Sequence, residues 1–551
     1  MTNPLRIAFL AGSDSPAIRT TIRTVCELPC VQPVAILLDT AKPATSRRFR
    51  NFRRNVRKDG AGYALRRAAE AINRILDKYA DRVIPRAEVD ELLRKTFPES
   101  TFTLSELSLK LHCPLLEVGN LNESPALDTL RECAPDLGVV LGTRILKRPT
   151  FSIPALGCIN LHKGKVPEFR GMPPAFWELY EGAESAGVTV HFVDEGLDTG
   201  DIIGTCEIPI HRNETEISLR SKLDREGALL ITECIRQLQA GTAQCRPQPP
   251  STARPRTRPT RQQRQELARR RPGVIQQPKM VRRTLKTAFY LASFHLRIYS
   301  VVRWLRRATK TSRAAVVLYH RVNDFSVDPL TTSTRAFAEH LVFFNRYYRV
   351  CGSEWLIDRL RRRQPIAANT LAIHFDDCYR DVFTLATPLL KSAGMPATAF
   401  ISSGFIGTTR AFQHDLDRYP FVYENLNADE VRKLPDNGVS IGAHTVNHVD
   451  LGTVSSENVN HEIVDCKKQL ETVADHPVTL FSFPFGKKSN IREDVRELIK
   501  KAGFQALFSA HGGFVHANTD VYDVPRIGVS SAHRPLDLMM ELEGITLTNW
   551  L

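Results

Sequence analysis

The chain has 551 residues, a formal net charge of +15 and 11 cysteines. This length exceeds what one hydrophobic core usually serves, so we expect two domains of roughly 200–250 residues each. No run of about 18 apolar residues occurs, and the first apolar run is too short for a secretory signal, which argues against a membrane span and against export. The cysteines form no Cys-x-x-Cys pair and follow no regular spacing. This usage is typical of free thiols in the cytoplasm and excludes a disulfide framework.

The positive charge is concentrated in three segments, residues 47–58, 246–271 and 280–310. Basic clusters favour anionic partners such as nucleic acid, anionic lipid or phosphorylated ligands. A solvated basic surface explains each cluster equally well. The sequence carries no zinc-finger, RNP or helix-turn-helix signature, so we do not expect a nucleic-acid partner.

The first 240 residues alternate predicted strands with predicted helices. A strand, a glycine-containing turn, a helix and a second strand are expected within residues 5–35. Further strands are predicted at 136–142, 159–162 and 188–193, and helices at 66–79 and 218–239. This alternation indicates an α/β domain with a twisted, mostly parallel sheet, which we assign to residues 1–245.

Residues 246–312 differ in composition from what precedes them. Proline and arginine dominate up to residue 272, which predicts an extended basic linker. After it, apolar side chains recur at helical spacing among arginines, at Leu291, Phe294, Ile298, Val301 and Leu305. No acidic residue occurs within 280–310. Such a helix fits a membrane interface or packs on the following domain, and we favour packing because apolar stripes usually face a protein core.

Residues 313–551 return to strand–helix alternation. Six strands are predicted, at 314–319, 370–375, 397–401, 439–442, 479–482 and 505–508. Six such strands separated by helices suit a (β/α) barrel that need not be complete. The polar residues described below fall where these strands end, the face on which barrels place their chemistry.

A first cluster of polar residues begins within the strand predicted at 159–162. Residues two apart in a strand point the same way, so Asn160 and His162 are expected to project into one cleft. Transfer of a one-carbon acyl group to an amine develops an oxyanion and releases a proton. Asn160 is a neutral donor suited to the oxyanion, and His162 can act as acid or base near neutral pH. Asp198, on a tight Leu-Asp-Thr-Gly turn, can orient that imidazole and accept a proton through water.

Three motifs around this cluster occur in a fixed order. They read Gly-Cys-Ile-Asn-Leu-His-Lys-Gly at 157–164, Pro-Glu-Phe-Arg-Gly at 167–171 and Gly-Leu-Asp-Thr-Gly-Asp at 196–201. With them, residues 130–210 closely resemble the catalytic region of the 10-formyltetrahydrofolate-dependent formyltransferases, whose domain is Rossmann-like. The resemblance implies 10-formyltetrahydrofolate as cofactor, Asn160, His162 and Asp198 as the catalytic triad, and Arg144, Ile145 and Leu146 at the folate pocket. The basic insertion within 40–110 departs from the family pattern and leaves the acceptor substrate undefined.

A second cluster offers the ligands of a metal ion. Asp377 supplies a carboxylate, and His444 and His448 are four residues apart, a spacing that places two imidazoles on one side of a helical turn. Two imidazoles and one carboxylate leave coordination positions open for water and substrate, as a hydrolytic centre needs. The neighbouring Asp376 can then serve as general base. Zinc is the first expectation from ligand type, and cobalt, iron or nickel would also fit.

Five motifs around the second cluster resemble those of the polysaccharide deacetylases of carbohydrate esterase family 4, which fold as a distorted (β/α) barrel. They lie at 318–322, 374–378, 441–448, 483–486 and 524–527. The resemblance implies that Asp376 is the base and that Asp377, His444 and His448 bind the metal. Cys378 stands where the family has glycine, and neither the Arg-x-Pro-Tyr-Gly motif nor the late Leu-x-His acid is found. His511 and His516 are the candidates for that acid.

We interpret the chain as a bifunctional enzyme of amino-sugar modification. The second half would remove an N-acetyl group, and the first half would place a formyl group on the freed amine. The sugar could be carried by a nucleotide or a lipid, with peripheral contact at the inner face of a membrane. Three alternatives stay open: a formyltransferase paired with a deformylase, a formyltetrahydrofolate hydrolase, and a membrane-associated binding protein with one inactive site.

Overall fold

The computed structural model describes residues 4–40, 52–54, 56–57, 60–98, 103–212, 214–249, 254–271, 280–324, 328–416 and 423–546. The basic cluster expected at 47–58 lies mostly outside the described residues. The chain divides into two compact units, one of residues 1–60 with 99–276 and one of residues 61–98 with 277–551.

This division differs from the boundaries expected at 1–245, 246–312 and 313–551. Residues 61–98 belong to the second unit, although they precede most of the first. Residues 246–276 belong to the first unit, and the helices after residue 280 belong to the second. Sequence composition does not reveal such an exchange, because it depends on tertiary contacts.

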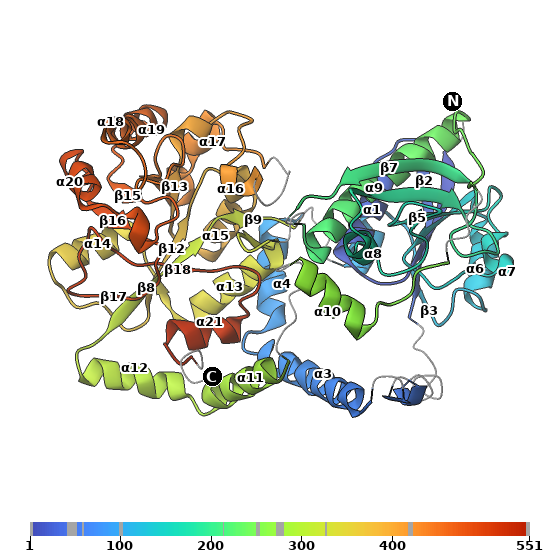
Figure 1. Ribbon diagram of the computed structural model, residues 1–551, viewed down its shortest axis with the longest axis horizontal. Coiled ribbons are helices and arrows are strands. Elements are labelled where there is room, and N and C mark those ends of the chain that lie inside the picture. Colours follow the sequence, from blue (N-terminus) through green and yellow to red (C-terminus); the bar gives the residue numbers. More distant parts are fainter. Residues whose placement is uncertain are drawn as a thin grey trace. The chain divides into compact units, whose positions relative to one another are not determined.

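Seven described strands form the sheet of the first unit, in the order β3-β2-β1-β4-β5-β6-β7 (Figure 1). They are β1 (Leu5–Ala11), β2 (Val31–Asp39), β3 (Leu115–Val118), β4 (Leu137–Leu141), β5 (Cys158–His162), β6 (Ser185–Phe192) and β7 (Ile202–Pro209). Neighbours from β3 to β5 pair in parallel, whereas β6 and β7 are antiparallel. The expected Rossmann-like α/β fold is confirmed.

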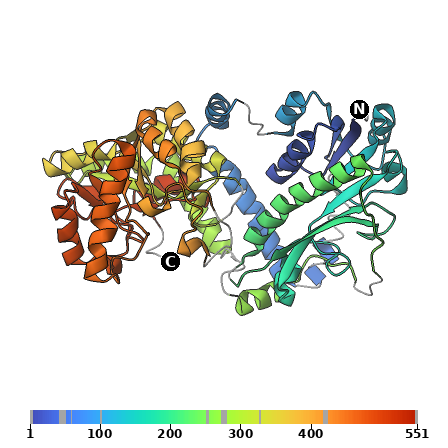
Figure 2. The same ribbon diagram turned by 90° about the horizontal axis from the view of Figure 1, so that it is seen from above.

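Helices cover both faces of this sheet. They are α1 (Pro16–Cys26), α5 (Leu104–Lys110), α6 (Ala126–Cys133), α7 (Arg148–Phe151), α8 (Phe176–Glu181), α9 (Glu216–Ala240) and α10 (Arg261–Arg270). Along β1, Ile7 and Phe9 join a core cluster with α1 and α9, whereas Ala8 and Leu10 join another with α6. Figure 2 shows α9 lying along one face of the sheet. The alternation follows from the two-residue period of a strand.

The segment expected as an extended basic linker folds back on the first unit. Arg246 pairs with Ile202 of β7, and Arg256 pairs with Gly171. The indole Nε1 of Trp177 donates to the carbonyl of Thr257 at 3.1 Å. Residues 261–270, expected to be extended, form α10, whose start is capped by the side chain of Thr260. The arginines of this segment therefore stack on the first unit's aromatic rings, as Arg264 does on Phe176.

The strands of the second unit form a curled, mainly parallel sheet. Six consecutive neighbours are β8 (Arg313–Tyr319), β12 (Thr370–Phe375), β13 (Ala397–Ile401), β14 (Val439–Ala443), β15 (Leu480–Ser482) and β16 (Ala506–Phe508). Shorter strands are β9 (Arg321–Val322), β10 (Thr331–Thr332), β11 (Arg349–Val350), β17 (Val515–His516) and β18 (Ile527–Gly528). Phe508 of β16 bridges Val524, and β18 then pairs with β8, so residues 524–528 return the sheet to its first strand. The expected distorted (β/α) barrel is confirmed.

Helices surround this barrel. The α-helices are α3 (Ala61–Ala80), α4 (Arg86–Thr96), α11 (Met280–His295), α12 (Ile298–Ala308), α13 (Thr334–Tyr347), α14 (Ser353–Arg361), α15 (Thr387–Ala393), α16 (Gln413–Leu416), α17 (Ala428–Lys433), α18 (Ser456–Asn460), α19 (Cys466–Ala474), α20 (Glu493–Lys501) and α21 (Pro535–Leu542). Ion pairs to Arg335 (2.8 Å from Asp90) and Arg346 (3.0 Å from Glu88) hold α4 against α13. None of the described helices combines the length and the apolar character that crossing a bilayer requires.

The helical stretch predicted from residue 280 onward is two helices. Arg297 has a φ of 53° and ends the helical path between α11 and α12. Leu291 is buried, but Val301 and Leu305 of the same predicted stripe are exposed. Packing of the stripe on the barrel, which we favoured, therefore holds for part of α11 and not for α12.

Gly12, directly after β1, provides a test of the first unit's packing. A Cβ atom at this position would lie 2.0 Å from the carbonyl oxygen of Gly142, which follows β4. Because that neighbour is backbone, Gly12→Ala must separate the ends of two paired strands, and we expect a stability loss of about 1–3 kcal/mol. Thermal unfolding of the whole chain measures it. Gly119→Ala is the control, since nothing lies within 4 Å of its added atom. Equal melting of the two variants would contradict the close approach.

Candidate functional sites

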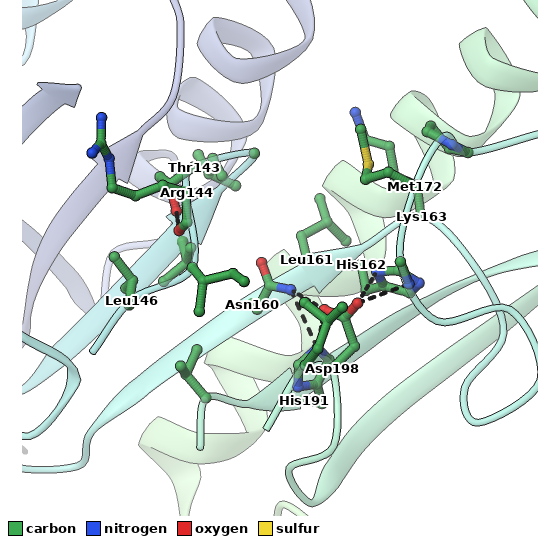
Figure 3. Close-up of a pocket in the computed structure, with 18 of the residues that line it drawn as sticks. Thr143, Arg144, Leu146, Asn160, Leu161, His162, Lys163, Met172, His191 and Asp198 are labelled. Atoms are coloured by element: carbon green, nitrogen blue, oxygen red, sulfur yellow. Dashed lines mark hydrogen bonds and ion pairs between the residues drawn. The ribbon is translucent and has the colours of Figure 1, made fainter. Parts of the chain in front are cut away.

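A cavity of about 560 Å³ opens at the carboxyl ends of β1, β4 and β5 in the first unit (Figure 3). Its wall contains Ser13 after β1, residues 142–146 after β4 and residues 160–163 at the end of β5. Parallel strands bring their carboxyl ends to one edge of a sheet, which is where open α/β sheets bind ligands.

Asn160, His162 and Asp198 all line this cavity. The side-chain Nδ2 of Asn160 donates to Oδ1 of Asp198 at 3.4 Å. Nδ1 of His162 lies 3.4 Å from Oδ2 of the same carboxylate. Figure 3 shows the three side chains converging, two from β5 and one from the loop after β6. The sequence prediction that these residues share one cleft agrees with this geometry.

His191 of β6 is a fourth member that the sequence analysis did not single out. Asn160 Nδ2 lies 3.2 Å from its Nε2, and the Nδ1 of His191 donates to the backbone carbonyl of Phe192 at 2.7 Å. With Nδ1 protonated, Nε2 is free to accept the proton of the Asn160 amide. The sequence feature that could have identified His191 is its place in the strand predicted at 188–193. That strand, β6, pairs with β5 and sets His191 opposite Asn160.

The charge states of this group follow from burial and neighbours. Burial lowers the pKa of His162, although the charge of Asp198 and the hydrogen bond to the carbonyl of Phe169 act in the opposite direction. For Asp198, burial raises the pKa, but the neighbouring imidazoles of His191 and His162 and the backbone amide of Gly171 outweigh it, and the pKa is lowered. The cavity therefore holds a neutral imidazole beside an ionised carboxylate near neutral pH.

The loop that carries Asp198 is fixed from both sides. Asp198 has a φ of 53°, and its Oδ2 accepts from the backbone N–H of Gly171 at 3.0 Å. Gln248, in the segment after α9, donates through Nε2 to the carbonyls of Asp198 (2.9 Å) and Gly200 (2.8 Å). The segment after α9, which the sequence analysis predicted to be a linker, thus positions the candidate catalytic loop.

Residues 144–146, expected at the folate pocket, form the opposite wall of the cavity. The guanidinium of Arg144 pairs with the carboxylate of Asp39, with Nη2 2.8 Å from Oδ1. Leu146 is buried and Ile145 is largely exposed. Arg256 also reaches the cavity, a residue that the sequence analysis counted only as linker charge.

The second site lies at the carboxyl ends of the barrel strands. Asp377 follows β12, and His444 follows β14. Nε2 of His448 lies 3.1 Å from Oδ1 of Asp377, and Nε2 of His444 lies 3.7 Å from the same atom. The helical turn expected for the two histidines is wrong: both lie in the loop after β14, where His448 has a φ of 54°. The loop conformation, and not helical spacing, brings the imidazoles together.

These three residues fit a divalent metal ion. Their ligand atoms all lie within 4.8 Å of one another. Both carboxylate oxygens of Asp377 are buried without a hydrogen bond, a state that calls for a cation. Nδ1 of His444 donates to the carbonyl of Ser482 at 2.8 Å, which leaves the Nε2 lone pair directed at the carboxylate. Burial raises the pKa of Asp377, but the imidazoles of His448, His414 and His320 outweigh it and hold the pKa well below its usual range.

Asp376, the expected base, is held by an arginine. Nη1 and Nη2 of Arg526 each donate to one of its carboxylate oxygens at 2.7 Å, and Arg526 is completely buried. Ser482 adds a hydrogen bond at 3.4 Å. Burial raises the pKa of Asp376, but the charges of Arg526 and His444 outweigh it, so the pKa is lowered. The bidentate pairing fixes the orientation of this carboxylate.

Two further imidazoles interact with the aspartate pair. His414 of α16 lies 3.7 Å from Oδ2 of Asp377 and 3.0 Å from the hydroxyl of Tyr379. Asp377 and Asp376 both act on the pKa of His320, where burial is the larger influence and lowers it. His320 and Arg526 lie in motifs that the sequence analysis noted without giving them roles, whereas no motif marked His414.

The other expectations for this site resolve as follows. His511 pairs with Asp523 at 3.1 Å, and His516 is exposed on β17. His320 and His414, which interact with the aspartate pair, join them as candidates for the acid. Cys378 is buried, and burial raises the pKa of its thiol, so this departure from the family pattern adds no charge to the site.

Comparison with known proteins agrees with two catalytic halves. A family model described as formyl transferase matches residues 86–235, and one described as polysaccharide deacetylase matches residues 363–507. Methionyl-tRNA formyltransferases of Clostridioides difficile and Syntrophus aciditrophicus are 34% and 38% identical over 141 and 136 residues, which is 25% and 24% of this chain and 46% and 44% of those proteins. The chain thus spans less than half the length of these curated relatives.

Solved structures of a deacetylase and of a transformylase each align with less than half of this chain. The Streptococcus pyogenes deacetylase PplD in complex with acetate aligns with 42% of this chain and 98% of its own, at 19% identity and a TM-score of 0.37. Glycinamide ribonucleotide transformylase 1 from Symbiobacterium toebii aligns with 43% of this chain and 89% of its own, at 18% identity and a TM-score of 0.29. Two separate segments of the chain therefore match family models, residues 86–235 the formyl transferase model and residues 363–507 the polysaccharide deacetylase model.

Gln248→Ala tests whether the segment after α9 positions Asp198. The variant removes both hydrogen bonds from the Gln248 side chain to the loop, so we expect faster amide hydrogen exchange across residues 196–201. Gln262→Ala, an exposed glutamine of α10, is the control. Exchange that is as slow in the Gln248 variant as in the control would show that the loop is held by other contacts.

Proposed function

We propose that the chain is a bifunctional enzyme that removes an N-acetyl group from an amino sugar and transfers a formyl group to the freed amine. The observation that carries the proposal is the presence on one chain of two separate sites whose residues suit opposite reactions of an amide bond. The free thiols of the described cysteines suit a reducing compartment, so we place both reactions in the cytoplasm.

In the first site, the proposed donor is 10-formyltetrahydrofolate, which supplies a one-carbon acyl group when bound in the cavity. Residues 144–146 would form the wall against its ring system, leaving the opposite wall to the acceptor amine. Attack of the amine on the formyl carbon would place negative charge on the formyl oxygen. That charge would be lost when the donor's carbon–nitrogen bond breaks and the released tetrahydrofolate nitrogen takes up a proton. The Asn160 N–H that makes the long 3.4 Å contact with Asp198 would turn to this oxygen and stabilise its charge.

The same step requires the amine to lose a proton. His162 is neutral because of its burial, so one of its ring nitrogens can accept a proton. Asp198, 3.4 Å from Nδ1 of His162, then stabilises the imidazolium as an ionised neighbour. The backbone N–H of Gly171 holds this carboxylate, and Gln248 holds the backbone carbonyl of Asp198. This arrangement supports acyl transfer to an amine without a covalent enzyme intermediate.

In the second site, Asp377, His444 and His448 would hold a divalent cation, for which zinc is our first choice from the ligand types. When bound, such an ion polarises an acyl carbonyl and acidifies water. Asp376, oriented by Arg526, is the proposed acceptor of the proton from attacking water. Burial lowers the pKa of both His320 and His414, so we propose these neutral imidazoles as relays that pass the proton taken up by Asp376 to the departing sugar amine.

Acetyl is the proposed group to be removed, because hydrolysis of a formyl group would only undo the modification made at the first site. Acetyl removal followed by formyl addition instead gives a net exchange of one acyl group for another. The family description of the second half, polysaccharide deacetylase, supports a sugar as the substrate class. We propose a nucleotide- or lipid-linked amino sugar, in line with the positive net charge.

Removal of one metal ligand tests the second site. Asp377→Asn keeps the shape of the side chain but removes the negative charge, so we expect Zn²⁺ affinity to fall by at least about 100-fold. Isothermal titration of the metal-free chain with Zn²⁺ measures the affinity. Asp436→Asn, an exposed residue of the same unit, is the control. Tight, equal binding in both variants would rule out this metal site.

His162→Ala tests the first site and its independence from the second. We expect formyl transfer from 10-formyltetrahydrofolate to an amino sugar to fall about 100-fold or more, because proton transfer loses its acceptor. Metal-dependent deacetylation should be unchanged. The control is His211→Ala, which lies after β7. Consumption of 10-formyltetrahydrofolate without any acceptor would instead identify a hydrolase, and loss of both activities would contradict independent sites.

A further inference from the structure

Three helices of the second unit form a continuous surface that we call the helical platform: α3, α11 and α12. Figure 1 shows them in a row along the lower edge of the drawing. Asn73 of α3 accepts a hydrogen bond from Thr284 of α11 at 3.1 Å, and α12 follows α11 directly. The surface therefore belongs to a single unit of the fold.

The platform exposes large apolar side chains that a packed helix would bury. On α3 these are Leu65, Ile72, Ile75 and Tyr79, spaced by seven, three and four residues on one face. On α11, α12 and the residues between them they are Leu285, Phe289, Leu296, Val301, Trp304 and Leu305. Trp304 is 64% exposed, and Leu65 and Leu296 are more than 70% exposed. Exposed large apolar side chains gathered on three neighbouring helices indicate an interaction site.

The polarity of α12 is inverted relative to an ordinary surface helix. Arg303 and Arg306 point inward, 12% and 16% exposed, and both bind the buried carboxylate of Glu543. Their neighbours Trp304 and Leu305 point outward. Specific ion pairs thus hold the apolar side of α12 toward the surroundings, so its exposure is not a failure of packing.

Contacts also hold α3 and α11 with their apolar side chains facing outward. Asp77 of α3 pairs with Arg283 of α11 at 2.9 Å and with Arg534, directly before α21. On α11, Tyr290 and Leu291 are buried against the unit. The inward faces are therefore held by ion pairs and by buried side chains, and the apolar stripes are left outside.

Positive charge borders the exposed apolar residues. Arg297, Arg307 and Lys310 are exposed beside or on α12, and the sequence has no acidic residue between 280 and 310. Apolar side chains together with tryptophan, tyrosine and basic residues match the composition of helices that lie in the headgroup region of a bilayer. The charge complements anionic headgroups.

We propose that the helical platform docks on the surface of a bilayer that contains anionic lipid. The apolar side chains enter the headgroup region, and the arginines and lysines contact lipid phosphates. The helices lie in the plane of the surface and do not cross it. This docking depends on the surface alone and stands apart from the activities of the two sites.

Vesicle flotation tests the proposal with the whole chain. We compare the unchanged protein with two variants. The platform variant combines Val301→Ser, Trp304→Ser and Leu305→Ser. The control variant combines Leu109→Ser, Leu156→Ser and Leu229→Ser. The control residues are equally exposed but lie in the first unit. We expect binding to vesicles of phosphatidylglycerol and phosphatidylcholine, weakened about tenfold or more by the platform changes and unaffected by the control changes.

Charge and self-association give independent readouts. Arg297→Gln, Arg307→Gln and Lys310→Gln combined should reduce binding to the anionic vesicles, and added salt should do the same. Trp304 fluorescence should shift to the blue on binding, and Trp304→Phe should remove the shift. Equal flotation of the platform and control variants would overturn the proposal. So would a dimer in sedimentation that the platform changes dissociate while the protein ignores vesicles, because the occupant would then be a second copy.

Discussion

Burial of carboxylates at strand ends is the constraint on which both sites depend. An anion removed from water is stable only when opposite charges or hydrogen bonds lie against it. Asp198 meets this condition through Gly171, His162 and His191. Asp376 meets it through Arg526, and Asp377 has imidazoles around it but no hydrogen bond. The proposed chemistries differ because these carboxylates differ in their partners. A carboxylate that protein groups already bind can position an imidazole or act as a base. A buried carboxylate without a hydrogen bond suits a bound cation.

Parallel strands deliver these groups to one edge without any need for closeness in sequence. In the first unit β4 and β5 bring residues 142–146 beside Asn160 and His162, and in the barrel β12 and β14 bring Asp377 beside His444. The supporting residues come from farther away. Gln248 reaches back across about 50 residues to the Asp198 loop, and Arg526 reaches Asp376 across 150 residues. Each site is thus formed where strand ends meet, and a later segment of the chain holds its carboxylate or its loop in position.

The sequence allowed both fold classes and the principal site residues to be predicted, because strand periodicity and short motifs are local properties. The exchange of residues 61–98 into the second unit was not predictable, since nothing in their composition distinguishes the core they join. The basic charge of 246–271 suggested a linker, but tertiary contacts with Trp177 and Tyr180 order part of it. His414 could not be found because its approach to Asp377 depends on the course of a loop. The helical turn expected for His444 and His448 failed because a loop with positive φ angles replaced the helical spacing.

The central claim is that the two sites act in sequence on one nitrogen atom. The most direct measurement is mass spectrometry of an N-acetylated, nucleotide-linked amino sugar incubated with the zinc-loaded chain and 10-formyltetrahydrofolate. We expect the free amine to appear first and then to be replaced by the N-formyl sugar, and we expect the amine to accumulate when the folate is omitted. Retention of the acetyl group, together with loss of formyl from an N-formyl sugar offered in its place, would contradict it.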